Sequence, residues 1–145
     1  MKYITILFIF FTTLLVGCSD KDEIDGNSSS PSFAASAFFD ALYNHNNIDK
    51  ATEFATPKLR RVMRSYGTAK QFTLNYINMK FDKVKIEVDM SNTSLREQYG
   101  ETAKINMIFN GIKDGQKIVD MRSVQLVVKK GKWYVSKINS DPFAK

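Results

Sequence analysis

Cys18 is the only cysteine among the 145 residues of the chain. A single thiol cannot close an internal disulfide, and a free thiol on an exported protein is open to oxidation. Covalent modification of the sulfur would remove this liability. The residues before it favour such chemistry, because residues 15–17 read Leu-Val-Gly and end a stretch, Tyr3–Gly17, of fifteen residues without a charged side chain.

The Leu-Val-Gly-Cys order of residues 15–18 resembles the lipobox of bacterial lipoproteins. The resemblance implies that residues 1–17 are a signal peptide and that Cys18 receives a diacylglyceryl thioether and becomes the new N-terminus. The apolar stretch fits this prediction, because it is short for a membrane-spanning helix, which needs roughly 20 residues. An ordinary secretory signal without lipid, cut after Gly17, stays open as the alternative.

The residues after Cys18 bear on the membrane to which the lipid would attach. In lipoproteins of this kind an aspartate directly after the cysteine favours the inner membrane, whereas serine permits transport to the outer membrane. Ser19 follows here and Asp20 lies one place later. The resemblance therefore implies a lipid anchor in the outer membrane, facing the periplasm, with the inner membrane as the alternative. We expect residues 18–32, acidic and rich in serine, to be a flexible tether.

Proton-transfer chemistry could use Asp40, Tyr43 and Asp120, which together form a candidate pocket. Asp40 falls on a narrow polar stripe of an otherwise apolar helix, which favours contact with solvent. Asp120 lies in the middle of a strand, and Arg122 is two residues along on the same face, which favours an ion pair on the strand surface. We therefore expect no catalytic residues in this chain.

The sequence contains few residues that could bind a metal or a cofactor. Protein zinc sites take three or four Cys, His or carboxylate ligands, whereas this chain has one Cys and one His. His45 stands in a polar segment, residues 43–47, and is predicted to be a surface loop residue. The glycines are scattered singly, so that no phosphate-binding loop is formed. We expect neither a metal nor a cofactor.

Residues 33–145 are predicted to form one α+β domain, in which helices come first and strands follow. Helices are expected at Phe33–Asn44, where Ser32 is the expected N-cap, at Ile48–Ala55, and from Pro57 to Gly67. The first of these is apolar on almost all sides, which indicates deep burial against a curved sheet.

From Lys83 onwards the apolar residues recur at every second position, which predicts strands. A hairpin is expected at Asp114-Gly115, and the last strand is expected at Trp133–Ile138. Within Lys117–Lys130 the apolar positions change from odd to even numbers, so we predict a β-bulge near Arg122–Ser123. Serial hairpins of this kind predict an antiparallel meander of about four strands around the first helix.

The buried first helix, the later helix led by Thr-Pro, and the closing sequence VVKKGKWYVSKI of residues 127–138 are similar to the nuclear transport factor 2-like superfamily. The likeness is to small bacterial lipoproteins with domain of unknown function 4878. It implies a cone that holds a pocket, and the pairing of two copies through their sheets. Members of the superfamily include enzymes, ligand binders and interaction modules, so the fold does not decide the function.

Positive charge suggests what the domain could bind. The chain has a net charge of +6, and residues 33–145 carry 19 Lys and Arg against 11 Asp and Glu. Four basic residues crowd about two turns of the third predicted helix, away from its apolar stripe: Lys58, Arg60, Arg61 and Arg64. They form a candidate interaction face for anionic lipid, lipopolysaccharide phosphates or an acidic envelope protein, or else a solvated helix face. Export would exclude cytosolic nucleic acid as a partner.

These observations together favour a lipid-anchored protein of the cell envelope, a non-catalytic binding or interaction module on the periplasmic side. Two alternatives remain. One is an envelope immunity or exclusion lipoprotein that blocks an incoming toxin or transfer apparatus. The other is a small isomerase-like enzyme of the same superfamily, with an aspartate as the base and a tyrosine as the oxyanion donor.

Overall fold

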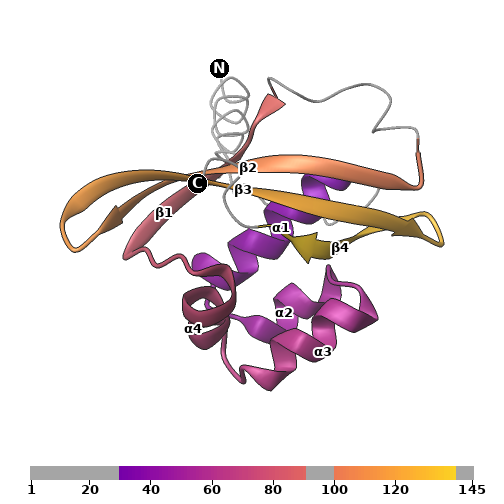
Figure 1. Cartoon of the computed structure of the whole chain (residues 1–145), viewed down its shortest axis with the longest axis horizontal. Coiled ribbons are helices and arrows are strands. Elements are labelled where there is room, and N and C mark those ends of the chain that lie inside the picture. The colour runs from indigo at the N-terminus through magenta and orange to yellow at the C-terminus, as the bar shows by residue number, and fades with distance from the viewer. Residues whose placement is uncertain (1–29, 91–99, 140–145) are drawn as a thin grey trace, which may run out of the picture.

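The structure, a computed structural model, describes residues 30–90 and 100–139. The helices are α1 (Pro31–Tyr43), α2 (Ile48–Glu53), α3 (Pro57–Ser65), α4 (Ala69–Phe72) and the π-helical turn η1 (Thr73–Ile77). The strands are β1 (Lys83–Val88), β2 (Thr102–Lys113), β3 (Gln116–Lys129) and β4 (Lys132–Ile138). The predicted α+β class and the meander are confirmed, because the four antiparallel strands lie in the order β1-β2-β3-β4 with the helices on one side of the open sheet (Figure 1).

Helix α1 lies directly against the sheet (Figure 1). It begins two residues earlier than predicted, because Ser30 rather than Ser32 caps it and accepts a hydrogen bond from Phe33 N at 3.1 Å. Proline at its first position has no N–H to leave unpaired. Phe38 and Phe39 are fully buried in the middle of the helix, as its apolar circumference predicts.

Of the remaining helices, α2 and α4 pack directly on α1, whereas α3 packs on α2 and against β4. Helix α2 ends at Glu53, two residues before the predicted end. Helix α3 begins at Pro57 as predicted, and its N-cap Thr56 accepts a hydrogen bond from Leu59 N at 3.4 Å. The segment after Gly67 continues as α4 and η1, and ends at Asn78, whose φ of 57° lies in the left-handed region.

The inner face of the sheet, which packs against α1, carries the apolar residues of alternate positions. Phe109 of β2 contacts Phe39 of α1 edge to face, with ring centroids 5.0 Å apart. The hairpins form where predicted, and Asp114, Gly115, Lys130 and Gly131 all have positive φ, as the tight turns of a right-twisted ribbon require.

The bulge predicted near Arg122–Ser123 is wrong. Strands β2 and β3 pair without a shift from Thr102↔Val127 to Lys113↔Gln116. Asp120 and Arg122 therefore continue the inner face, and Val119 lies on the opposite, outer face with 71% of its surface exposed. The prediction failed because it assumed that every apolar residue of the strand faces the core.

The shift of register occurs one strand later. Gln125 pairs with Lys137 and Leu126 pairs with Val135, which leaves Ser136 of β4 as the extra residue. Its hydroxyl donates a hydrogen bond to the Gln125 carbonyl at 3.0 Å. A bulge changes the twist of the strand and the direction of the side chains around it. Here it allows Val135 and Ile138, at an odd and an even position, both to point inwards.

The far edge of β4 is tied to the link between α2 and α3. Thr56 N donates to the Val135 carbonyl at 2.9 Å, and Val135 N donates to the Phe54 carbonyl at 2.8 Å. This short parallel bridge pairs part of an edge that would otherwise be open. It also places the first turn of α3 beside β4.

Trp133 is only 5% exposed and belongs to the core between sheet and helices. Trp133→Ala should lower the free energy of unfolding by about 3–5 kcal/mol, because a large aromatic side chain leaves a cavity. Urea unfolding of the full chain measures the loss. Lys132→Ala, at the exposed neighbouring position, is the control and should change it by less than about 0.5 kcal/mol. A loss below about 1 kcal/mol for Trp133→Ala would contradict the placement of this side chain.

Candidate functional site

Asp40 does not join the other two residues of the predicted pocket. Its carboxylate accepts a hydrogen bond from Asn44 Nδ2 at 2.7 Å and lies 3.0 Å from His45 Nε2. The Asp40 side chain is 35% exposed and that of His45 is 53% exposed. The predictions of a solvent-facing aspartate and of a surface histidine are therefore confirmed, and this contact is a local link at the end of α1.

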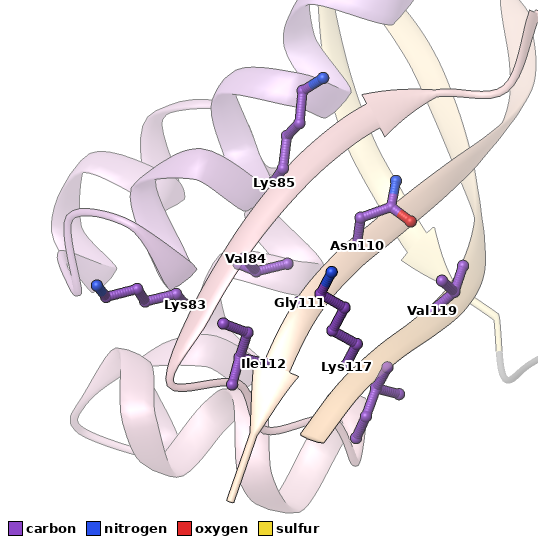
Figure 2. A pocket seen from close by; sticks show the side chains of 9 residues that line it. Lys83, Val84, Lys85, Asn110, Gly111, Ile112, Lys117 and Val119 are labelled. Carbon is purple, nitrogen blue, oxygen red and sulfur yellow. The ribbon is translucent and has the colours of Figure 1, made fainter. Parts of the chain in front are cut away.

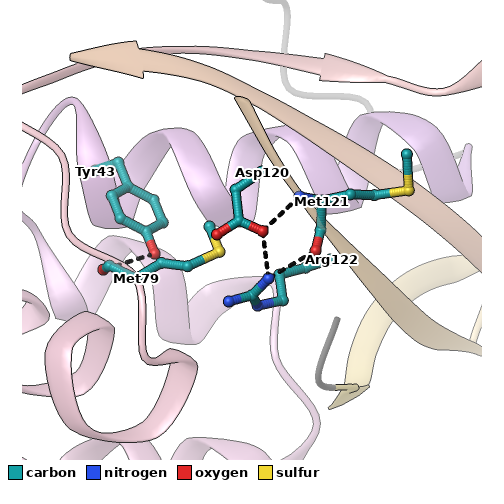
Figure 3. A network of polar contacts seen from close by, with 5 residues as sticks. All are labelled: Tyr43, Met79, Asp120, Met121 and Arg122. Carbon is teal, nitrogen blue, oxygen red and sulfur yellow. Dashed lines mark hydrogen bonds and ion pairs between the residues drawn. The ribbon is translucent and has the colours of Figure 1, made fainter. Parts of the chain in front are cut away.

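Tyr43 and Asp120 do come close to each other beneath the sheet (Figure 3). Asp120 Oδ1 lies 2.6 Å from Arg122 Nη1, which also donates to the Met121 carbonyl at 2.7 Å. The predicted ion pair is thus present, but its placement on the surface is wrong. Arg122 is 7% exposed and pairs across the sheet with Met107 on the inner face.

The arginine side of this ion pair is poorly solvated, whereas the Asp120 side chain is 29% exposed. The Nε atom of Arg122 is buried and makes no hydrogen bond within the described residues. Burial raises the pKa of Tyr43 well above its usual value, an effect that Arg122 opposes and Asp120 reinforces. Tyr43 therefore stays a neutral phenol, and its hydroxyl donates to the Met79 carbonyl at 3.3 Å. Each group is engaged with a protein partner, as in a structural network.

The hollow that Tyr43 lines does not include the two aspartates of the predicted pocket. It has a volume of about 280 Å³, and its charged lining residues are Lys70, Lys80 and Asp82. In the described part of the chain, no three His, Cys, Asp or Glu side chains are grouped as metal ligands are. Within the same residues, no helix has the length and apolar character needed to cross a membrane.

A second hollow, of about 350 Å³, lies where β1, β2 and β3 meet at one end of the sheet (Figure 2). Its walls include Val84, Ile112 and Val119. Figure 2 shows the side chains of Lys83 and Lys85 extending away from it. Lys85 already forms an ion pair, because its Nζ lies 2.8 Å from Glu87 Oε1. The hydrogen bond and positive charge of Lys85 lower the pKa of the Glu87 carboxyl group.

The largest hollow, about 860 Å³, lies between α3 and the β3–β4 hairpin and is here called the basic groove. Four cationic side chains line it: Lys58 and Arg61 from α3, Lys129 from β3, and Lys137 from β4. No aspartate or glutamate is among its lining residues. None of the four cations forms an ion pair with a described carboxylate. Among the described residues, therefore, no carboxylate neutralises the positive charge that the basic groove concentrates.

The predicted basic face of α3 is brought only partly into this groove. Lys58 and Arg61 line it, whereas Arg64 is exposed elsewhere on the helix. Arg60 points back towards α2, where its Nε donates to the Thr52 carbonyl at 3.0 Å and its Nη2 to the Ala55 carbonyl at 3.2 Å. Arg60 thus ties α2 to α3 as well as lining a smaller adjacent hollow.

Sequence reasoning missed Lys129 and Lys137, which supply half of the charge in the groove. Both lysines lie in the lysine-rich residues 127–138. That segment indicated a final strand and the family resemblance, but not a cationic surface. Nothing in the spacing indicated that this hairpin lies beside α3, about 70 residues earlier. That proximity results from the hydrogen bonds between Val135 and the segment before α3.

No protein-family model matches the chain, and no curated protein is similar to it. Among solved structures, the chain is similar to a SEC-C motif-containing protein from Rhodopseudomonas palustris. The TM-score is 0.60 at 15% sequence identity, over 79% of this chain and 80% of the other. A likeness at this identity concerns the arrangement of helices and strands alone.

The buried ion pair makes a testable contribution to stability. Asp120→Asn should lower the free energy of unfolding by about 1–3 kcal/mol, because it leaves the buried guanidinium of Arg122 without its counter-charge. Replacing both residues, Asp120→Leu with Arg122→Met, should cost less than the single change, since no buried charge remains. Urea unfolding of the full chain compares the variants. A single variant within 0.5 kcal/mol of the wild type would contradict the structural role of the pair.

Proposed function

We propose that this protein is a lipid-anchored, non-catalytic binding module on the periplasmic side of the bacterial outer membrane. In this proposal Cys18 carries the lipid, and a nuclear transport factor 2-like domain presents the basic groove to an anionic partner of the envelope. The observation that carries the proposal is the groove itself. Four cations from segments far apart in the sequence gather there, and no described acidic side chain lines the groove or pairs with them.

The anchor rests on the sequence, because the lipobox lies outside the described residues. The Leu-Val-Gly-Cys order, the apolar stretch before it and the absence of any other cysteine support it. A diacylglyceryl group supplies two acyl chains, which meets the usual requirement for stable anchoring. The domain begins twelve residues after Cys18 and would therefore work close to the bilayer.

A binding role is favoured over catalysis because the candidate acid–base groups are occupied. Asp40 is paired with His45 and Asn44, and Asp120 is paired with Arg122. The nuclear transport factor 2-like assignment is supported by the curved antiparallel sheet that packs on the first helix (Figure 1). In such a domain a hollow on the surface can bind a partner without any reacting group.

Charge reversal in the groove tests the binding role. A photo-crosslinking amino acid at Tyr76, which lines the groove, should capture the partner, whether lipid or protein, in intact cells. Lys58→Glu with Arg61→Glu should lower the yield of crosslinked product at least ten-fold, because the anionic partner is then repelled. Lys113→Glu with Lys117→Glu, at exposed positions on either side of the β2–β3 turn and outside the groove, is the matched control and should leave the yield unchanged. Equal yields from both double variants would contradict an anionic partner in this groove.

Substitution of the single thiol tests the anchor. The wild-type protein should fractionate with membranes and incorporate a labelled fatty acid. Cys18→Ser should abolish the label and release the protein from the membrane fraction, because the acyl attachment site is lost. Immunoblots of fractionated cells and the mass of the purified protein measure both effects. An unlabelled wild-type protein of unmodified mass would refute lipid anchoring.

A further inference from the structure

The basic groove continues into the smaller hollow beside it. The smaller hollow has a volume of about 250 Å³, and its cationic lining residues are Arg60, Lys129 and Lys130. Both hollows share Pro57 and Lys129, so that Lys129 stands at the junction between them. Together they present six cationic side chains, and neither is lined by an acidic residue. Such a pair of adjoining cationic hollows suits two anionic groups joined in one molecule.

One of these cations is held in a fixed position. Arg60 is half-buried and donates two hydrogen bonds to backbone carbonyls, of Thr52 and Ala55. A guanidinium fixed in this way loses little side-chain entropy when it binds a further acceptor. The lysines at the junction and on the opposite wall are exposed, and lysine binds phosphate as a compact point charge. The first turn of α3 also contributes its positive dipole end, because Thr56, Pro57 and Lys58 line the groove.

The walls between the cations are apolar. Leu59, Val62 and Val127 line the basic groove, and Tyr76 with 37% of its surface exposed lies among them. The Tyr76 ring is stacked on Phe72, with centroids 4.9 Å apart and an angle of 14° between the rings, so that it is held rigidly. An inorganic anion would gain nothing from these walls. A phosphate-bearing molecule with a hydrocarbon or glycerol portion would cover them.

We propose that the two hollows together bind the headgroup of a membrane lipid that carries at least two phosphate groups. This inference rests on the proposed role of the basic groove and names its ligand class. One phosphate lies in the basic groove near Lys58 and Arg61, the other lies in the smaller hollow near Arg60, and Lys129 contacts both. The apolar walls of the groove cover the glycerol and the first carbons of the acyl chains.

Size and location favour a lipid over an acidic protein. The basic groove, at about 860 Å³, lies within the usual range of small-molecule sites, about 300–1,000 Å³, and the smaller hollow, at about 250 Å³, lies just below it. Protein partners usually bind to flatter and wider surfaces. Eleven residues separate Cys18 from Ser30, the first described residue, and such a chain spans at most roughly 40 Å. A domain anchored at Cys18 would therefore meet lipid headgroups at high local concentration.

Calorimetric titration of the full, lipidated chain in neutral detergent micelles tests this inference. The probes are short-chain diphosphatidylglycerol with two phosphates, short-chain phosphatidylglycerol with one, inorganic pyrophosphate without acyl chains, and a hexaglutamate peptide. Diphosphatidylglycerol should bind at least ten-fold more tightly than each of the other three. Lys129→Gln should weaken its binding at least ten-fold, because both phosphates lose a contact. Lys113→Gln, an exposed lysine of β2 outside both hollows, should leave it unchanged.

Four results would overturn the inference. Pyrophosphate binding as tightly as the lipid would make the site one for free phosphate, and equal binding of hexaglutamate would make it one for acidic protein. Equal binding of the two lipids would remove the requirement for two phosphates. An unchanged affinity of Lys129→Gln would place the ligand elsewhere. If any of these occurs while charge reversal still abolishes crosslinking in cells, the proposed binding function stands and only the ligand class is wrong.

Discussion

The burial of α1 is the constraint on which the rest of this structure depends. The helix carries Phe38 and Phe39 side by side, and seven of its thirteen residues are buried. No single layer can cover a helix that is apolar on almost all sides, so the sheet packs on one side of α1, and α2 and α4 pack on another. Helix α3 in turn packs on α2 and against β4.

The basic groove is a consequence of this packing. Helix α3 packs on α2 and against β4, and its start lies at the edge of β4, where backbone hydrogen bonds between Val135 and the segment before α3 join the two. Two lysine- and arginine-bearing segments then face each other across a hollow. The bulge at Ser136 adds to this, because Gln125, Ser136 and Lys137 at the shift of register form part of the wall.

On the inner face of the sheet, the cost of burying a charged group is opposed by an ion pair and a hydrogen bond. Asp120 and Arg122 occupy positions where apolar residues would pack well, and the burial of the Arg122 guanidinium is costly because it loses water, whereas the Asp120 side chain stays 29% exposed. The short contact between them and the bond to the Met121 carbonyl offset part of this cost. Tyr43, kept neutral by burial, lies next to the pair without adding charge. The end of α1 is held instead by the hydrogen bond from Tyr43 to the Met79 carbonyl and by the packing of the Tyr43 ring against Phe109 of β2.

The sequence by itself determined the elements whose signals are local. Proline at the start of α3, Asp-Gly in the turn between β2 and β3, and alternation in β1 and β2 depend on neighbouring residues only, and these predictions were confirmed. Tertiary structure decided which face of β3 is inner, since Asp120 and Arg122 could be buried only by pairing with each other. Tertiary structure also formed the basic groove, because packing between segments distant in the chain brings Lys129 and Lys137 to the same hollow as Lys58 and Arg61. The spacing of residues within either segment does not indicate this proximity.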